Sequence, residues 1–223
     1  RQAVGEREFA RMYLLDLAAA SGATLRREWL TRYPHARIDP AWPVIIGVDY
    51  ASTADQLTAG QRDYFAVAIG RALPGGAGMV LVDGFRGKVS QGEAEMKLKH
   101  IADRYPTTQL IGVEAQGKGE EFYHLMLRTS NLPIQPMHTG RSSKGERFEI
   151  GMAPLFQFSR AWVSDLETPF LRDFEEEWVN WPHSRNDDTL DAVYWMLCAG
   201  APHLIRTTSG SRKKNPFTEL RRS

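Results

Sequence analysis

The sequence predicts an α/β fold, in which a mixed β-sheet combines an antiparallel meander with parallel strands and carries helices on both faces. Two observations lead to this prediction. Three short apolar or β-branched runs follow one another between residues 44 and 84, with a turn signal at residues 74–78, as is typical of a meander. Beyond residue 90, segments with helical spacing alternate with short apolar runs, which adds parallel strands and covering helices.

The individual elements follow from periodicity and from turn residues. Residues 5–17 have apolar side chains at helical spacing. Residues 31–43 contain three prolines and are expected to be irregular. Ser90 and Glu93 have the spacing of a capping box. The expected strands are 44–50, 63–70, 78–84, 109–114, 133–138 and 160–163, and the later helices are 90–105, 119–128, 144–158, 170–179 and 187–199.

Composition divides the chain into three parts. Residues 1–43 are interpreted as an N-terminal helix and connector, 44–202 as the globular domain, and 203–223 as a basic, flexible tail. The 28 basic and 27 acidic residues give a net charge of +1, although six basic residues and one acid lie in 201–223. The total argues against a purely electrostatic nucleic-acid binder. The tail is either a solvated terminus or an arm that contacts phosphates.

Several classes of protein are excluded by composition and motifs. The single cysteine, Cys198, allows neither an internal disulfide nor a multi-cysteine zinc site. No apolar run is long enough to span a bilayer, and there is no phosphate-loop or nucleophile-elbow motif. The chain starts at Arg1 without a signal-peptide pattern, and we expect a non-membrane protein that is a piece of a longer one.

Acidic residues end two of the predicted central strands. Asp49 follows a Val-Ile-Ile-Gly-Val run, and Glu114 ends Leu-Ile-Gly-Val. The carboxyl ends of buried strands are where α/β sheets place their ligands. Gly47 and Gly112 lie at matching offsets before the two acids and permit close backbone approach.

A third acidic group lies at the start of the last predicted helix, where Asp187, Asp188 and Asp191 occur together. Acids in a first helical turn can simply complement the helix dipole. Asp191 lies further along the helix beside an apolar stripe, and either Asp187 or Asp188 can share its face. Carboxylates from several elements suit hard divalent ions and two-metal phosphoryl transfer.

These motifs, taken in order, resemble those of the ribonuclease H-like nuclease superfamily, and within it the C-terminal nuclease domain of the large terminase subunit of tailed bacteriophages. The resemblance covers nearly the whole chain. It rests on Ile46-Gly-Val-Asp-Tyr-Ala, Gly112-Val-Glu-Ala-Gln-Gly and Asp187-Asp-Thr-Leu-Asp-Ala, which resemble the three acidic motifs of that family. Residues 143–148 with 153–158 resemble its helix before a short strand, and 9–13 with 27–30 resemble its interdomain linker.

The resemblance implies a Mg²⁺- or Mn²⁺-dependent endonuclease that uses two ions to cut double-stranded, concatemeric viral DNA during genome packaging. By this resemblance, Asp49, Glu114 and Asp188 would be the catalytic metal ligands, and Asp191 an outer or second-site carboxylate. Asp187 remains an alternative to Asp188. The expected DNA-binding residues are Lys144, Arg147, Lys213 and Lys214, although the first two are equally well interpreted as solvated helix charges.

The same resemblance implies partners and a location. The expected partners are double-stranded DNA, an upstream packaging ATPase domain, a portal and a small terminase subunit, and the expected location is the host cytoplasm rather than the mature virion. The alternatives are a Holliday-junction resolvase or transposase-like nuclease of the same fold, and a non-catalytic ribonuclease H-like binding module. No base-reading motif is evident, so we expect little sequence preference.

Overall fold

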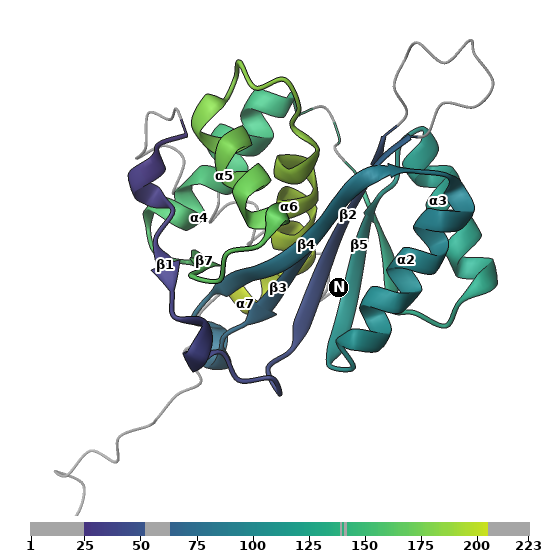
Figure 1. The fold of residues 1–223 in the computed structure, drawn as a ribbon, viewed down its shortest axis with the longest axis horizontal. Helices are drawn as coiled ribbons and strands as arrows, with labels where there is room; N and C mark the ends of the chain where they lie inside the picture. The colour runs from purple at the N-terminus through teal and green to yellow at the C-terminus, as the bar shows by residue number, and fades with distance from the viewer. Residues whose placement is uncertain (1–24, 52–62, 139, 141, 205–223) are drawn as a thin grey trace, which may run out of the picture.

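The computed structural model describes residues 25–51, 63–138, 140 and 142–204, and its centre is one seven-stranded sheet (Figure 1). The strands are β1 (Arg32–Tyr33), β2 (Val44–Ala51), β3 (Asp63–Ala72), β4 (Met79–Val89), β5 (Thr108–Glu114), β6 (Ile134–Met137) and β7 (Ala161–Ser164). Their order in the sheet is β1-β7-β4-β3-β2-β5-β6. β3 is antiparallel to both β2 and β4, and all other pairs are parallel. The predicted combination of a meander with parallel strands is confirmed.

Helices cover both faces of this sheet, as predicted. On one face lie α2 (Gln91–Arg104) and α3 (Lys118–Thr129). On the other lie the π-helical segment η4 (Glu146–Met152), α4 (Ala153–Gln157), α5 (Pro169–Asn180) and α6 (Asp188–Ala199), as Figure 1 shows. The remaining short helices are η1 (Arg27–Trp29), η2 (His35–Arg37), η3 (Pro74–Gly76) and α7 (Ala201–Leu204). In the described part of the chain, no helix has the length and apolarity to cross a membrane.

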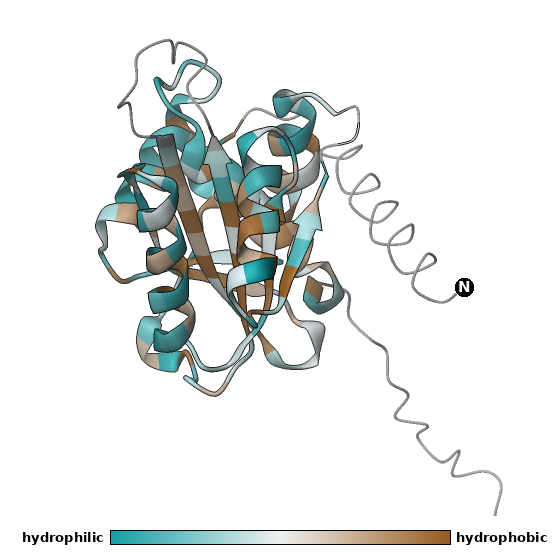
Figure 2. Cartoon of the chain, turned by 90° about the vertical axis from the view of Figure 1, so that its right-hand side faces the viewer, coloured by the Kyte–Doolittle hydropathy of each residue, from teal (hydrophilic) through white to brown (hydrophobic). Residues whose placement is uncertain are grey.

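The strands alternate their side chains between two apolar cores. In Figure 2 the hydrophobic colour is concentrated on the strands, while the outer surfaces of the helices are largely hydrophilic. On β2, Ile45 packs toward α6, whereas Val44, Ile46, Val48 and Tyr50 pack toward α2 and α3. Because side chains alternate along a strand, Asp49 belongs to the α6 face.

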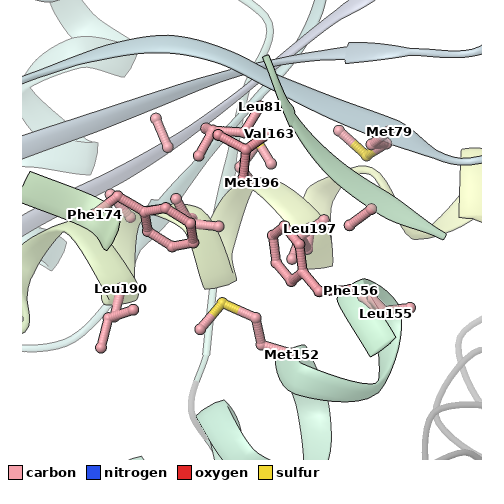
Figure 3. Close-up of a cluster of buried hydrophobic side chains, with 14 of the residues drawn as sticks. Met79, Leu81, Met152, Leu155, Phe156, Val163, Phe174, Leu190, Met196 and Leu197 are labelled. Atoms are coloured by element: carbon pink, nitrogen blue, oxygen red, sulfur yellow. The ribbon is translucent and has the colours of Figure 1, made fainter. Parts of the chain in front are cut away.

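Helix α6 lies unusually close to β2 because of a glycine. A Cβ atom at Gly47 would be 2.1 Å from the carbonyl oxygen of Ala192 and 2.2 Å from the amide nitrogen of Met196. No other residue type fits such a distance. Figure 3 shows the core that this approach creates, in which Leu190, Met196 and Leu197 of α6 meet side chains of β4, β7, α5 and the η4–α4 segment. The predicted role of Gly47 in close approach is confirmed.

Some local predictions need correction. The Ser90–Glu93 capping box is present as predicted, and so are the strands and helices within a few residues of their expected ends. The helix predicted over 144–158 is a π-helical segment followed by a short α-helix. The segment expected to be irregular contains β1, which pairs with β7. The predicted helix at 5–17 and nearly all of the predicted tail lie outside the described residues.

Candidate functional site

Strands β2 and β5 place Asp49 and Glu114 side by side. The two strands are parallel, with Gly47 opposite Gly112 and Val48 opposite Val113. Asp49 and Glu114 are the next residue along each strand, so both acids occupy the same carboxyl edge. Asp49 is only 3% exposed, and the neighbouring Glu114 carboxyl group contributes to the raised pKa of Asp49. The sheet register therefore brings the two acids that end these strands to the same edge.

Helix α6 brings two further carboxylates to this edge. The helix begins at Asp188, and Asp187 is its N-cap residue, although the Asp187 side chain makes no capping hydrogen bond. Asp191, expected further along the helix than the first turn, lies in that turn, because the helix begins at Asp188, and it is 3% exposed. Because Gly47 lets the backbone of α6 approach β2, the start of the helix reaches Asp49. Four acids from three elements thus converge at one place.

Burial and mutual repulsion disfavour the ionised forms of these acids. The pKa of Asp49 is raised well above its usual value, first by burial and then by Asp191, Glu114 and Asp188. Burial also raises the pKa of Asp188 and of Asp191, against the lowering effect of neighbouring cations. Carboxylates in this arrangement are expected to attract a compensating positive charge. A perturbed cluster of this kind is typical of functional sites.

Two basic side chains from the η4 region supply part of that charge. Lys144 Nζ lies 2.6 Å from Asp187 Oδ1 and 2.9 Å from Asp191 Oδ2. Arg147 Nη1 lies 2.9 Å from Asp191 Oδ1 and 3.8 Å from Glu114 Oε1. The atoms Arg147 Nη1 and Asp191 Oδ1 are close, but they are not aligned as a hydrogen bond. Their attraction is therefore mainly that of an ion pair.

A second basic group, which sequence reasoning missed, holds Asp188. Arg86 of β4 places both Nε and Nη2 at 3.1 Å from Asp188 Oδ2. Its Nη1 lies 3.8 Å from Glu177 Oε1 and 3.5 Å from Asp173 Oδ2, both on α5. Arg86 therefore joins the start of α6 to α5.

Glu177 was also missed, and it supports the same helix end. Its Oε2 accepts hydrogen bonds from the backbone amides of Thr189 and Leu190, and from the Thr189 hydroxyl. These amides are among the donors that a helix leaves unsatisfied at its N-terminus. Glu177 is 4% exposed, and burial raises its pKa to about 7 despite these donors and Arg86. A buried carboxylate thus fixes the turn that carries Asp188 and Asp191.

The donor set suits a hard divalent ion, although it is not arranged around one. The oxygens of Asp49, Glu114, Asp188 and Asp191 are ligands of the type that Mg²⁺ and Mn²⁺ prefer. Asp191 Oδ1 is buried without a hydrogen-bond partner among the described residues. Within those same residues, no three His, Cys, Asp or Glu side chains form a ready-made metal site. Metal binding by these oxygens would require side-chain rearrangement, because Lys144, Arg147 and Arg86 now pair with them.

The residues predicted to bind DNA differ in their surroundings. Lys144 is half-exposed, whereas Arg147 is 5% exposed and its guanidinium lies over the rings of Tyr194 and Trp195. These surroundings favour pairing of Arg147 with carboxylates rather than contact with DNA. Lys213 and Lys214 lie outside the described residues. Trp178 and Trp195 are core residues.

By sequence, the chain matches no protein-family model and no curated protein. Its structure is similar to several solved ones. The large terminase nuclease of thermophilic phage G20c, with bound zinc, superposes with a TM-score of 0.57 at 15% identity, over 77% of this chain and 94% of that one. The Thermus phage P74-26 large terminase nuclease domain has a TM-score of 0.54 at 16% identity, over 77% and 91%. The HK97 bacteriophage large terminase has a TM-score of 0.54 at 11% identity, over 78% of this chain and 43% of its own.

Sheet order, covering helices and converging acids define a ribonuclease H-like fold. More particularly, the chain has the fold of the nuclease domain of phage large terminases. The G20c nuclease has been solved with bound zinc, cobalt and magnesium.

Proposed function

We propose that this chain is a divalent-metal-dependent DNA endonuclease of the large-terminase type. One observation carries the proposal: Asp49, Glu114, Asp188 and Asp191, from two parallel strands and one helix, meet at the carboxyl edge of the sheet and perturb one another. The likeness to terminase nucleases, one of them solved with three different divalent ions, supports it.

In this proposal the residues have distinct tasks. Asp49, Glu114 and Asp188 hold Mg²⁺ or Mn²⁺, and Asp191 serves a second ion or the outer shell. Bound divalent ions would supply an activated water and offset the charge on the leaving oxygen. Arg86 and Glu177 fix the first turn of α6 and thereby the direction of its two acids. Lys144 and Arg147 hold the carboxylates together in the metal-free protein.

The biological setting follows as part of the same proposal. The substrate is double-stranded, concatemeric viral DNA, which is cut during genome packaging. The partners are an upstream packaging ATPase domain, a portal and a small terminase subunit, acting in the cytoplasm of the host. The likeness to the HK97 large terminase, of which the matched part is 43%, supports a further domain in the natural protein.

Plasmid nicking tests the activity. We expect supercoiled DNA to be cut with Mg²⁺ or Mn²⁺ and to survive in a chelator. Asp49→Asn and Glu114→Gln should each lower the rate by roughly 100-fold or more, because each change removes a charged oxygen where the reaction needs it. Asp103→Asn, an equivalent change at an exposed position on α2, is the matched control. Wild-type cutting by both site variants would show that the acids are not the site.

A further inference from the structure

A row of side chains on β3 and β4 extends away from the acidic cluster on the same face of the sheet. Asp49 is opposite Ala66 on β3, which in turn is opposite Arg86 on β4. Two residues further on, Ala51 is opposite Tyr64, which is opposite Lys88. Cross-strand partners project to the same side of a sheet, and two residues along a strand cover about 7 Å. Lys88 therefore lies one step beyond Arg86, which itself touches Asp188.

The Tyr64 ring contacts both cations of this row. The Arg86 guanidinium carbon lies 5.3 Å from the centre of the Tyr64 ring, and Lys88 Nζ lies 4.7 Å from it. Contacts of this kind hold a cation over an aromatic face. The ring thus keeps the Lys88 ammonium on the same face as the acids, although Lys88 itself is exposed.

The charges around the site explain why such a cation would matter. A cluster of four carboxylates repels a DNA phosphate, and among the described residues the cations nearest to the cluster are already engaged. Lys144 and Arg147 pair with Asp191, and Arg86 pairs with Asp188. Lys88 is the next cation along the row, and it lies at the exposed rim.

We propose that Tyr64, Arg86 and Lys88 form a phosphate-binding strip, in which Arg86 stays paired with Asp188 and contacts the Tyr64 ring, and Lys88 contacts the backbone of the DNA strand next to the cut. The inference rests on the proposed function, because it assigns the path of the substrate at that same site. The strip contacts the DNA backbone and not the bases, so it binds duplexes of any sequence. It also gives the substrate a direction, along β4 and away from α6.

Duplex binding without cutting tests the strip. Fluorescence anisotropy with a labelled duplex of about 30 base pairs, in chelator, would be measured between about 50 and 200 mM KCl. We expect Lys88→Ala to weaken binding about fivefold and to reduce the slope of log K against log salt by about one. Tyr64→Leu should weaken binding by a smaller factor, because Lys88 keeps its charge but loses the aromatic ring that holds its ammonium group in place. Two duplexes of unrelated sequence should lose affinity equally.

The matched control is Lys97→Ala on the opposite face. Lys97 Nζ lies 4.6 Å from the centre of the Phe85 ring, a contact of the same kind, but on the α2 side of the sheet. The affinity of Lys97→Ala for DNA should be within about twofold of that of wild type, because the Lys97 charge faces away from the strip. Calorimetry with Mn²⁺ alone should give the same affinity for Lys88→Ala as for wild type.

The outcomes separate this inference from the proposed function. If wild type binds and cuts DNA while Lys88→Ala keeps its affinity and salt slope, the strip is wrong and the nuclease stands. If binding depends on Lys88 but no metal supports cutting, Lys88 still contacts the DNA backbone, whereas the nuclease and the placement of a cut beside Lys88 are wrong. Failure of wild type to bind any duplex overturns both.

Discussion

The two faces of the sheet hold different kinds of core. The face under α2 and α3 is packed by aliphatic and aromatic side chains, and Arg71, its buried charge among the described residues, is hydrogen-bonded to Pro40 O, Trp42 O and the Thr107 hydroxyl. The face under α6 buries Asp49, Arg147, Glu177 and Asp191 together.

The α6 face also leaves polar atoms unsatisfied. Arg147, Glu177, Asp191 and Trp195 each have a buried polar atom without a hydrogen-bond partner among the described residues. Unsatisfied buried groups lower stability, and they are typical of sites where a ligand completes the network. Both faces have an apolar core, and we infer that the α6 face gives up part of its stability for function.

The largest expected effect is on stability, and it tests whether the two faces are independent. Leu98 of α2 is fully buried, and Leu98→Ala should lower the free energy of unfolding by about 2–5 kcal/mol, because it leaves a cavity. Mn²⁺ affinity, measured by calorimetry where the variant is folded, should not change. Asp49→Asn should do the opposite, abolishing Mn²⁺ binding with little loss of stability. If Leu98→Ala weakened metal binding in the folded protein, the two faces would not be independent.

The next effect is the pH dependence of the metal-free protein. Glu177 has a raised pKa of about 7 in the folded state, against 4.5 as the ordinary value. Between these two values the folded protein binds more protons than the unfolded one, so the free energy of unfolding falls as pH rises, by on the order of 3 kcal/mol for this residue. The raised pKa values of Asp49, Asp188 and Asp191 act in the same direction. Burial lowers the pKa of His203, which opposes the trend.

Denaturant titrations from pH 5 to pH 8 measure this dependence. The control is Glu177→Gln, which keeps an acceptor for the Thr189 and Leu190 amides but does not titrate. Its stability should fall less with pH than that of wild type, and the difference cancels the contributions of His203 and of surface acids. A wild-type protein that gains stability over this range, with the same slope as Glu177→Gln, would contradict the assignment of Glu177 as a buried acid.

The smallest expected effect concerns Lys144, whose ammonium group pairs with the acids of the site. Lys144 pairs with Asp187 and Asp191, and its side chain is 45% exposed, so solvent screens much of the interaction. Lys144→Met should let Mn²⁺ bind about fivefold more tightly, because the ion no longer competes with a tethered ammonium. Lys97→Met, on the opposite face, should bind Mn²⁺ as wild type does. Weaker Mn²⁺ binding by Lys144→Met would mean that Lys144 assists the metal instead of standing in for it.

The sequence predicts the half of the site that local patterns encode. Asp49 and Glu114 end apolar strands, and Gly47 precedes Asp49 at the offset that permits close packing. Arg86 and Glu177 have no such signal. Arg86 reaches Asp188 across 102 positions of sequence, and Glu177 is the last of three consecutive glutamates on α5. Its burial follows from how α5 packs on α6, which no local pattern contains.

The same limit applies to Arg147. Its neighbours in sequence suggest an exposed helical charge, whereas the π-helical turn and the rings of Tyr194 and Trp195 enclose it. Long-range packing decides which charges are buried, and periodicity alone does not.

A crystal structure of the protein soaked in Mn²⁺, with the ion located by its anomalous scattering, tests the central claim most directly. The account predicts manganese bound by carboxylate oxygens of Asp49, Glu114 and Asp188, with Lys144 moved away from Asp191. Manganese held by Asp187 in place of Asp188 would correct the ligand set. Absence of manganese from this edge of the sheet, at a concentration that supports DNA cutting, would contradict the account.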